Sequence, residues 1–326
     1  MSMPPEVMRR QLPRGEPEWG DFHFDFFGGT TSPDFWVVLN DIGRPTTCEC
    51  ARSRTVLVCA EPSAVHGYHP RFISQFGAVL SCQAGMRHPR LLLGQPGLLW
   101  WAGVEMMADG KCRVRFDYED FRKMAFGPKD DRISVINSGK ALVPGHRERN
   151  HFLAVLKAHF RDRLEVFGRG SRPVADKLEA ISPFKYHIAI ENSVEPHYWS
   201  EKLADAFLGG AMPFYSGCPD IENYFPAGSL CRIDLRDPAG AINLIEQTLA
   251  SDGFARSADA RNEARGRVLN EHNTFALLAR ILPTFPDGPR RTITVRPHSD
   301  LAKPFHGRLK RRARRALERI APGLLR

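Results

Sequence analysis

The chain has 326 residues, of which 42% are hydrophobic and 25% are charged, and its formal charge is +9 at pH 7. This length fits two domains of ordinary size, and the composition is typical of a globular protein. No apolar run approaches the roughly 18 to 20 residues of a membrane-spanning helix, and no signal-peptide pattern opens the chain, so we expect a cytoplasmic protein. The positive charge predicts an anionic partner: nucleic acid, a phosphorylated small molecule or an anionic membrane surface.

The first part of the chain alternates short apolar runs with polar segments. Residues 1–20 are rich in Pro, Arg and Glu, show no period and are expected to form an irregular lead-in. Apolar runs then predict strands buried on both faces at 35–39, 55–60 and 78–81, with a short helix at 69–76. We predict a first domain over 21–130.

The same pattern restarts after the charged segment at 126–131. Five strands are predicted, at 133–136, 164–167, 187–190, 213–215 and 230–233, and three helices, at 149–160, 200–208 and 241–249. Strands that alternate with helices indicate mostly parallel sheets. The sequence therefore predicts an α/β protein in which a second domain over 131–295 faces the first across a cleft, both domains being Rossmann-like.

The last segment, 296–326, differs in composition from the rest of the chain. Apolar residues can line one side of a helix there, and its other sides carry Lys310, Arg311, Arg312, Arg314 and Arg315. Such a basic amphipathic tail suits peripheral contact with an anionic inner membrane surface through residues 305–326. It also suits a closing helix that packs back on the first domain, and the sequence leaves both interpretations open.

A polar cluster follows the strand predicted at 187–190. In a parallel sheet, ligands bind where strands end and helices begin. Two side chains lie at the predicted strand end and three at the start of the next helix: Glu191, Asn192, Tyr198, Glu201 and Lys202. A lysine near a helix N-terminus adds to the positive end of the helix dipole and can hold a diphosphate. The alternative is that Ser200 caps the helix and that Glu201 and Lys202 are first-turn surface charges.

The order of these residues resembles the alpha-1,3/4-fucosyltransferases, glycosyltransferase family 10, of the bacterial type. The resemblance is carried by FKYHIAIENS, the Tyr and Glu-Lys after it, and MPFYSG, within residues 184–217. GHRERNHF and LEVFGRG resemble further family motifs, although Leu164-Glu165 replaces the usual Val-Asp. LVCAEPSAVHG and AVLSCQAGMRHP resemble acceptor-domain segments, although Cys82-Gln83 stands where Tyr-Arg is usual.

The resemblance implies a GT-B fold with an N-terminal acceptor domain and a C-terminal domain that binds GDP-fucose. It implies that Arg149 and Lys202 contact the diphosphate, that Glu201 and Asn192 hold ribose or fucose hydroxyls, and that Tyr198 lies beside the nucleotide. Glu61 is the candidate general base, and Glu191 is a second catalytic candidate that orients the fucosyl centre or holds its own loop. Arginine and lysine can neutralise the leaving group, so we expect no obligatory metal or other cofactor.

The expected activity is inverting transfer of L-fucose from GDP-fucose to an N-acetylglucosamine-containing glycan, in alpha-1,3 or alpha-1,4 linkage. A bacterial surface polysaccharide such as a lipopolysaccharide is the expected context. One alternative is a related GT-B enzyme that uses another nucleotide sugar. The other is an inactive basic protein on this fold that binds membrane or nucleic acid, although no nucleic-acid-binding signature accompanies the charge.

Overall fold

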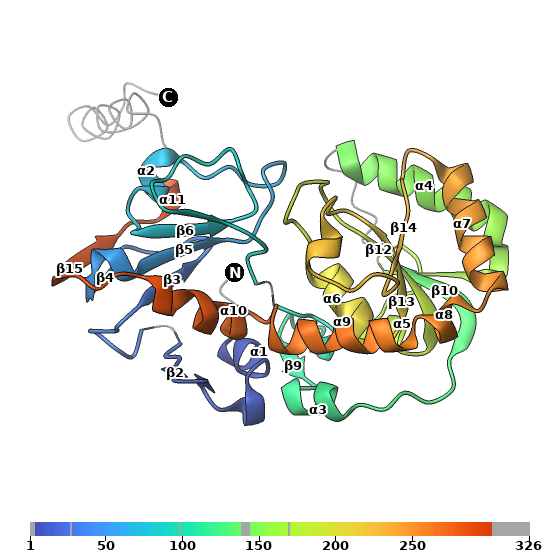
Figure 1. Ribbon diagram of the computed structural model, residues 1–326, viewed down its shortest axis with the longest axis horizontal. Helices are drawn as coiled ribbons and strands as arrows, with labels where there is room; N and C mark the ends of the chain where they lie inside the picture. Colours follow the sequence, from blue (N-terminus) through green and yellow to red (C-terminus); the bar gives the residue numbers. More distant parts are fainter. Residues whose placement is uncertain (1–3, 27, 98, 138–143, 169, 302–326) are drawn as a thin grey trace, which may run out of the picture.

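The structure, a computed structural model, describes residues 4–26, 28–97, 99–137, 144–168 and 170–301. Two α/β domains lie side by side, and each is built around its own sheet (Figure 1). The predicted fold class is confirmed, because two Rossmann-like domains that face each other across a cleft are the GT-B arrangement. From residue 302 onward, the predicted basic tail and its membrane contact lie outside the described residues.

The N-terminal domain contains a four-stranded parallel sheet in the order β3-β5-β6-β7. Its strands are β3 (Trp36–Leu39), β5 (Thr55–Cys59), β6 (Ala78–Ser81) and β7 (Leu91–Leu93). All five residues of β5 and all four of β6 are buried, which explains why the sequence shows continuous apolar runs rather than alternation. The expected short helix is α2 (Pro70–Ile73), which packs its buried Phe72 and Ile73 into this domain's core.

The C-terminal domain contains a five-stranded, wholly parallel sheet in the order β11-β10-β12-β13-β14. Its strands are β10 (Asp130–Ile136), β11 (Leu164–Phe167), β12 (Phe184–Ile190), β13 (Met212–Ser216) and β14 (Cys231–Arg232). Its helices are α4 (Pro144–Phe160), α5 (Leu178–Ile181), α6 (Glu201–Leu208), α7 (Pro238–Ala250), α8 (Gly253–Arg256) and α9 (Ala258–Asn270). Every predicted strand and helix of this half therefore has a counterpart in the structure.

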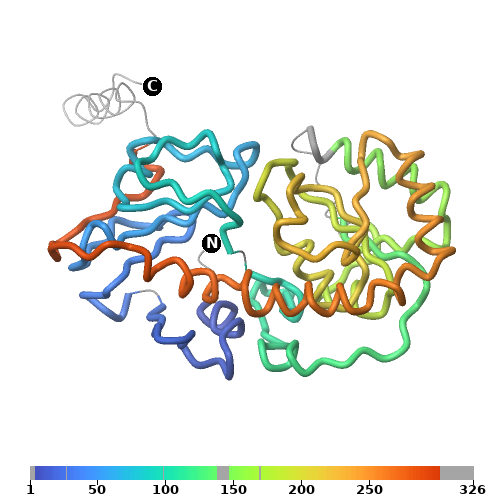
Figure 2. Tube along the Cα trace, in the orientation of Figure 1, coloured from blue at the N-terminus to red at the C-terminus, as the bar shows by residue number. Residues whose placement is uncertain are grey.

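The packing divides the chain differently from the predicted boundaries at 130 and 295. Strand β15 (Arg290–Val295) pairs antiparallel with β4 (Thr46–Ala51), and α10 (Thr274–Ile281) packs Leu277 and Leu278 against β5 and β6. The end of the described chain therefore returns to the N-terminal domain, where the red end of the trace runs beside the blue strands (Figure 2). The prediction placed this segment in the donor domain because a strand paired with a partner about 240 residues away leaves no local signal.

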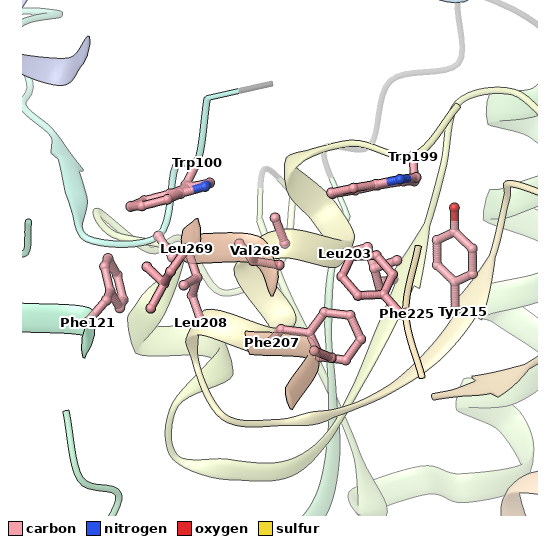
Figure 3. Packing of buried hydrophobic residues seen from close by; sticks show 14 of the residues in the cluster. Trp100, Phe121, Trp199, Leu203, Phe207, Leu208, Tyr215, Phe225, Val268 and Leu269 are labelled. Carbon is pink, nitrogen blue, oxygen red and sulfur yellow. The ribbon is translucent and has the colours of Figure 1, made fainter. Parts of the chain in front are cut away.

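The segment after residue 98 belongs by its packing to the C-terminal domain. Trp100 and Phe121 share a buried core with Leu208, Val268 and Leu269, which come from α6 and α9 (Figure 3). Gly97 thus still contacts α10 of the N-terminal domain, whereas Trp100 already packs in the C-terminal domain, and the chain crosses back between α9 and α10 near 271–273. The remaining α-helices and strands are α1 (Pro5–Arg9), β1 (Glu18–Trp19), β2 (Phe22–His23), β8 (Val104–Met106), β9 (Cys112–Val114), α3 (Tyr118–Lys123) and α11 (His298–Leu301). The prediction of an irregular lead-in over 1–20 is wrong where α1 and β1 form, because Val7 and Leu12 are fully buried.

Two further findings concern the cysteines and the length of the helices. All seven cysteines are free thiols, and five of them are buried. Among the helices that the structure describes, none combines the length and the apolar character needed to cross a bilayer.

Candidate functional site

A cavity of about 520 Å³ lies where the two domains meet. The loop after β5 contributes Glu61, Ala64 and Val65, and the rest of the lining comes from the C-terminal domain, largely at the carboxyl ends of β10 and β12 and at the start of α6. Five of the seven predicted site residues line it: Glu61, Arg149, Asn192, Glu201 and Lys202. The structure therefore brings the candidate base and both candidate phosphate ligands to one place.

Arg149 enters this cavity from α4. Phe152 and Leu156 are buried on the inner face of the same helix, and Arg149 lies one turn before Phe152, so its side chain also points inward. The residue is only 7% exposed, and its guanidinium has one distant contact, 3.5 Å from Nη1 to the Asn192 side-chain oxygen. Among the residues that the structure describes, its buried Nε and second Nη have no hydrogen-bond partner, and burial lowers the pKa of the group. A buried cation with unused donors fits an anionic ligand.

The start of α6 is fixed by a buried carboxylate. Ser200 caps the helix, because its hydroxyl accepts a hydrogen bond from the Lys202 N–H at 3.3 Å. Glu191 accepts hydrogen bonds from the Ser200 N–H at 2.7 Å and from the Ser200 hydroxyl at 2.6 Å. The Lys202 ammonium lies 3.1 Å from that hydroxyl and 3.4 Å from Glu191. The cap interpretation is thus confirmed, but Lys202 lines the cavity rather than the outer surface.

The far end of α6 explains why the helix is short. Gly210 has φ +67°, a left-handed conformation that glycine adopts without strain, and a Cβ there would meet the Phe126 ring at 2.4 Å. The N–H of Ala211 returns to the Ala206 carbonyl at 3.0 Å and closes the last turn. The helix therefore ends at Leu208, as the prediction of a helix over 200–208 requires.

Glu201 lies in the cavity between two ammonium groups. Its carboxylate is 3.5 Å from Lys202 Nζ and 3.4 Å from Lys177 Nζ. Burial alone would raise the pKa of Glu201, but the two lysines lower it to about 2. The same carboxylate and Glu191 raise the pKa of Lys202 against the effect of burial. Both groups are therefore charged at neutral pH, and an ionised Glu201 can accept hydrogen bonds from hydroxyl groups.

Glu61 faces these groups from the N-terminal domain. It is half-buried, and burial followed by the nearby Glu201 carboxylate raises its pKa. Gln83 supports its loop by donating hydrogen bonds to the Glu61 carbonyl at 2.8 Å and to the His66 carbonyl at 2.9 Å. The departure at Cys82-Gln83 thus has a structural role in placing the candidate base.

Tyr198 and Glu191 do not line this cavity. Tyr198 is 2% exposed, and burial raises its pKa far above the usual value. Glu191 has no exposed side-chain surface, and both carboxylate oxygens are occupied by Ser200. We therefore regard Glu191 as a positioning residue for the start of α6, which is one of the two roles the sequence left open for it.

Three residues that the sequence analysis did not single out also line the cavity: Lys177, His187 and Asp205. The sequence could have indicated Asp205, because it is a carboxylate inside the apolar stretch of α6, and a buried carboxylate must be paired. His187 is buried beside Ser134, 2.8 Å from its hydroxyl, and burial lowers its pKa to about 3. Lys177 lies in a short irregular segment, and no spacing connects it to its partners.

Comparison with known proteins finds sequence relatives among the fucosyltransferases. No protein-family model matches the chain. A fucosyltransferase-like protein of Arabidopsis thaliana is 32% identical over 105 residues, which are 31% of this chain and 20% of that protein. Alpha-(1,3)-fucosyltransferase 4 of Rattus norvegicus is 38% identical over 79 residues, which are 22% of this chain and 18% of that protein. The chain thus spans about a fifth of the length of these relatives.

Solved structures with a similar arrangement include two of alpha1,3-fucosyltransferases. One, with GDP, is 14% identical, covers 74% of this chain and 82% of its own, and has a TM-score of 0.45. The other, with GDP-fucose, is 16% identical, covers 63% of this chain and 65% of its own, and has a TM-score of 0.42.

Proposed function

The chain is related in sequence to the alpha-1,3/4-fucosyltransferases, and from that premise we propose that it transfers L-fucose from GDP-fucose to a glycan hydroxyl. The observation that carries the proposal is the buried guanidinium of Arg149, with unused donors, in one cavity with Lys202 and Glu61. This set can receive a leaving diphosphate on one side and accept a proton on the other.

In the proposed mechanism, Arg149 and Lys202 hold the diphosphate. Glu201 accepts hydrogen bonds from sugar hydroxyls, and the Asn192 amide donates or accepts them. Glu61 removes the proton from the acceptor hydroxyl while that oxygen bonds to C1 of fucose and the bond from C1 to GDP breaks. Attack from the face opposite GDP inverts the configuration at C1. The two cations neutralise the leaving group, so we propose that no divalent metal is required.

We place the acceptor in a second cavity of about 470 Å³, which is lined by the loop that follows Glu61, while Glu61 itself lines the first cavity. Its walls include Ser63 and Gly67 from the Glu61 loop, together with Tyr68, Gln83 and Glu195. These side chains offer both donors and acceptors to sugar hydroxyls. We propose an N-acetylglucosamine-containing glycan as the acceptor, as in a bacterial surface polysaccharide.

The first test is product formation from GDP-fucose with N-acetyllactosamine and with lacto-N-biose as acceptors. We expect fucosylated product from at least one of the two, in alpha linkage, and unchanged rates in the presence of a metal chelator. Absence of transfer with retained GDP binding would move the proposal to another nucleotide sugar or another acceptor.

Thermal stabilisation by GDP alone distinguishes a protein with a donor site from a basic protein that only binds membrane or nucleic acid. At a GDP concentration 100 times Kd, stabilisation of about 2.7 kcal/mol is expected, visible as a rise in Tm. The Lys202→Ala variant should lose this rise because it lacks one of the two diphosphate ligands. Lys123→Ala, which removes an exposed lysine of α3, should keep it. A Lys202→Ala protein that retains the full rise would contradict the placement of the donor.

A further inference from the structure

Lys177 contacts two carboxylates on one face of α6. Its ammonium lies 2.9 Å from Asp205 Oδ2 and 3.4 Å from Glu201 Oε1. Glu201 and Asp205 are four residues apart on the helix, so their side chains are neighbours and repel each other when both are charged. The single ammonium between them removes this repulsion.

Asp205 also binds the backbone of the segment that follows the crossover from the N-terminal domain. The Asp205 side chain is 1% exposed, and its Oδ1 accepts the N–H groups of Trp101 and Ala102, each at 2.9 Å. The residue before Lys177 continues the pattern, because Asp176 Oδ1 accepts the N–H of Gly103 at 2.8 Å. The N–H groups of three successive residues, 101–103, thus donate to two buried carboxylates. One is Asp205, which is bonded to Lys177, and the other is Asp176, the residue before Lys177.

Lys202 cannot replace Lys177 in this network. Its ammonium is shared among the Ser200 hydroxyl, Glu191 and Glu201, and the Glu201 contact is the longest of the three at 3.5 Å. His187, which also lines the cavity, is neutral because burial and then the Lys177 charge lower its pKa to about 3. Loss of Lys177 would therefore leave Glu201 with one weak ion pair and an uncompensated neighbour at Asp205.

We propose that Lys177 is a positioning residue for donor binding, which holds the Glu201 carboxylate toward the cavity and connects it through Asp205 to residues 101–103, the segment that follows the crossover from the N-terminal domain. The inference rests on the proposed function, since it assigns Glu201 to the donor. Lys177 itself needs no contact with the donor, because its effect passes through Glu201.

The test is calorimetric titration of the full chain with GDP-fucose in the absence of acceptor. Lys177→Met should weaken binding by about tenfold, the loss expected for a hydrogen bond to a charged group. Lys177→Gln, which keeps a donor toward Asp205 and so guards against unfolding, should show a similar loss. Lys177→Arg should restore most of the affinity, and Lys123→Met should match the wild type.

A double-mutant cycle with Glu201→Gln separates this role from general support of the fold. If Lys177 acts through Glu201, adding Lys177→Gln to Glu201→Gln should cost no further affinity. Additive losses in the double mutant would overturn the inference. Equal affinities of wild type, Lys177→Met and Lys177→Gln for GDP-fucose would also overturn it. So would a Lys177→Arg protein that binds GDP-fucose as weakly as Lys177→Met. A wild-type chain that binds neither GDP-fucose nor GDP would instead overturn the proposed function.

Discussion

Replacement of Glu61 by glutamine is expected to abolish transfer and to leave GDP binding intact. Glutamine keeps the size of the side chain and its place in the loop, but it cannot take a proton. Loss of a positioned general base costs about 10² to 10⁴ in rate. The initial rate of transfer from GDP-fucose and the Kd for GDP, measured on the same preparation, check both halves of the expectation.

The pH profile provides a second measurement of the same base. Glu61 must be ionised to act, and burial and the Glu201 carboxylate raise its pKa. As the pH falls, activity should therefore decline at a pH above the ordinary glutamate value of about 4.3. Glu222→Gln, at an exposed surface ion pair, should leave rate and profile unchanged. A Glu61→Gln protein with normal rate would remove Glu61 from the mechanism.

The second large effect is expected from Arg149→Ala. Removing a preorganised cation at the leaving group should lower kcat/KM by about 10² to 10³. Arg149→Lys should recover little, because an ammonium lacks the planar fork that matches phosphate oxygens. Arg147→Ala is the matched control, since Arg147 is exposed two residues earlier on the same helix. Steady-state kinetics with GDP-fucose as the varied substrate give the comparison.

The change in Tm that Arg149→Ala causes in the ligand-free protein can also be predicted. A buried guanidinium with unused donors costs folding free energy, so its removal should leave Tm unchanged or raise it. The same variant should lose the rise in Tm that GDP gives the wild type. A ligand-free variant that melts well below the wild type would mean that Arg149 supports the fold rather than the donor.

Local sequence predicted the C-terminal domain well because its signals are local. Each strand is a short apolar run, and the start and end of α6 are marked by Ser200 and Gly210, whose effects depend on neighbouring residues. Residues that follow strand ends could likewise be assigned to the site, since parallel strands end at one edge of the sheet.

Other features depend on contacts that no local pattern encodes. Glu191 and Glu201 are both carboxylates that follow β12 in the chain. Only the tertiary structure shows that Glu191 is buried against Ser200 and that Glu201 lines the cavity. Lys177 meets its partners 24 and 28 residues away. The pairing of β15 with β4 joins segments at opposite ends of the chain.

That last pairing determines the order in which the two domains can be completed during synthesis. Domains generally fold as units while the chain leaves the ribosome, and the N-terminal one is usually finished first. Here the segments that build the C-terminal domain core have all been synthesised once residue 270 has been made, whereas the N-terminal domain still lacks α10 and β15. A chain released after residue 273 would contain every core segment of the C-terminal domain and a β4 without its β15 partner, and such an unpaired edge is a template for association with other chains.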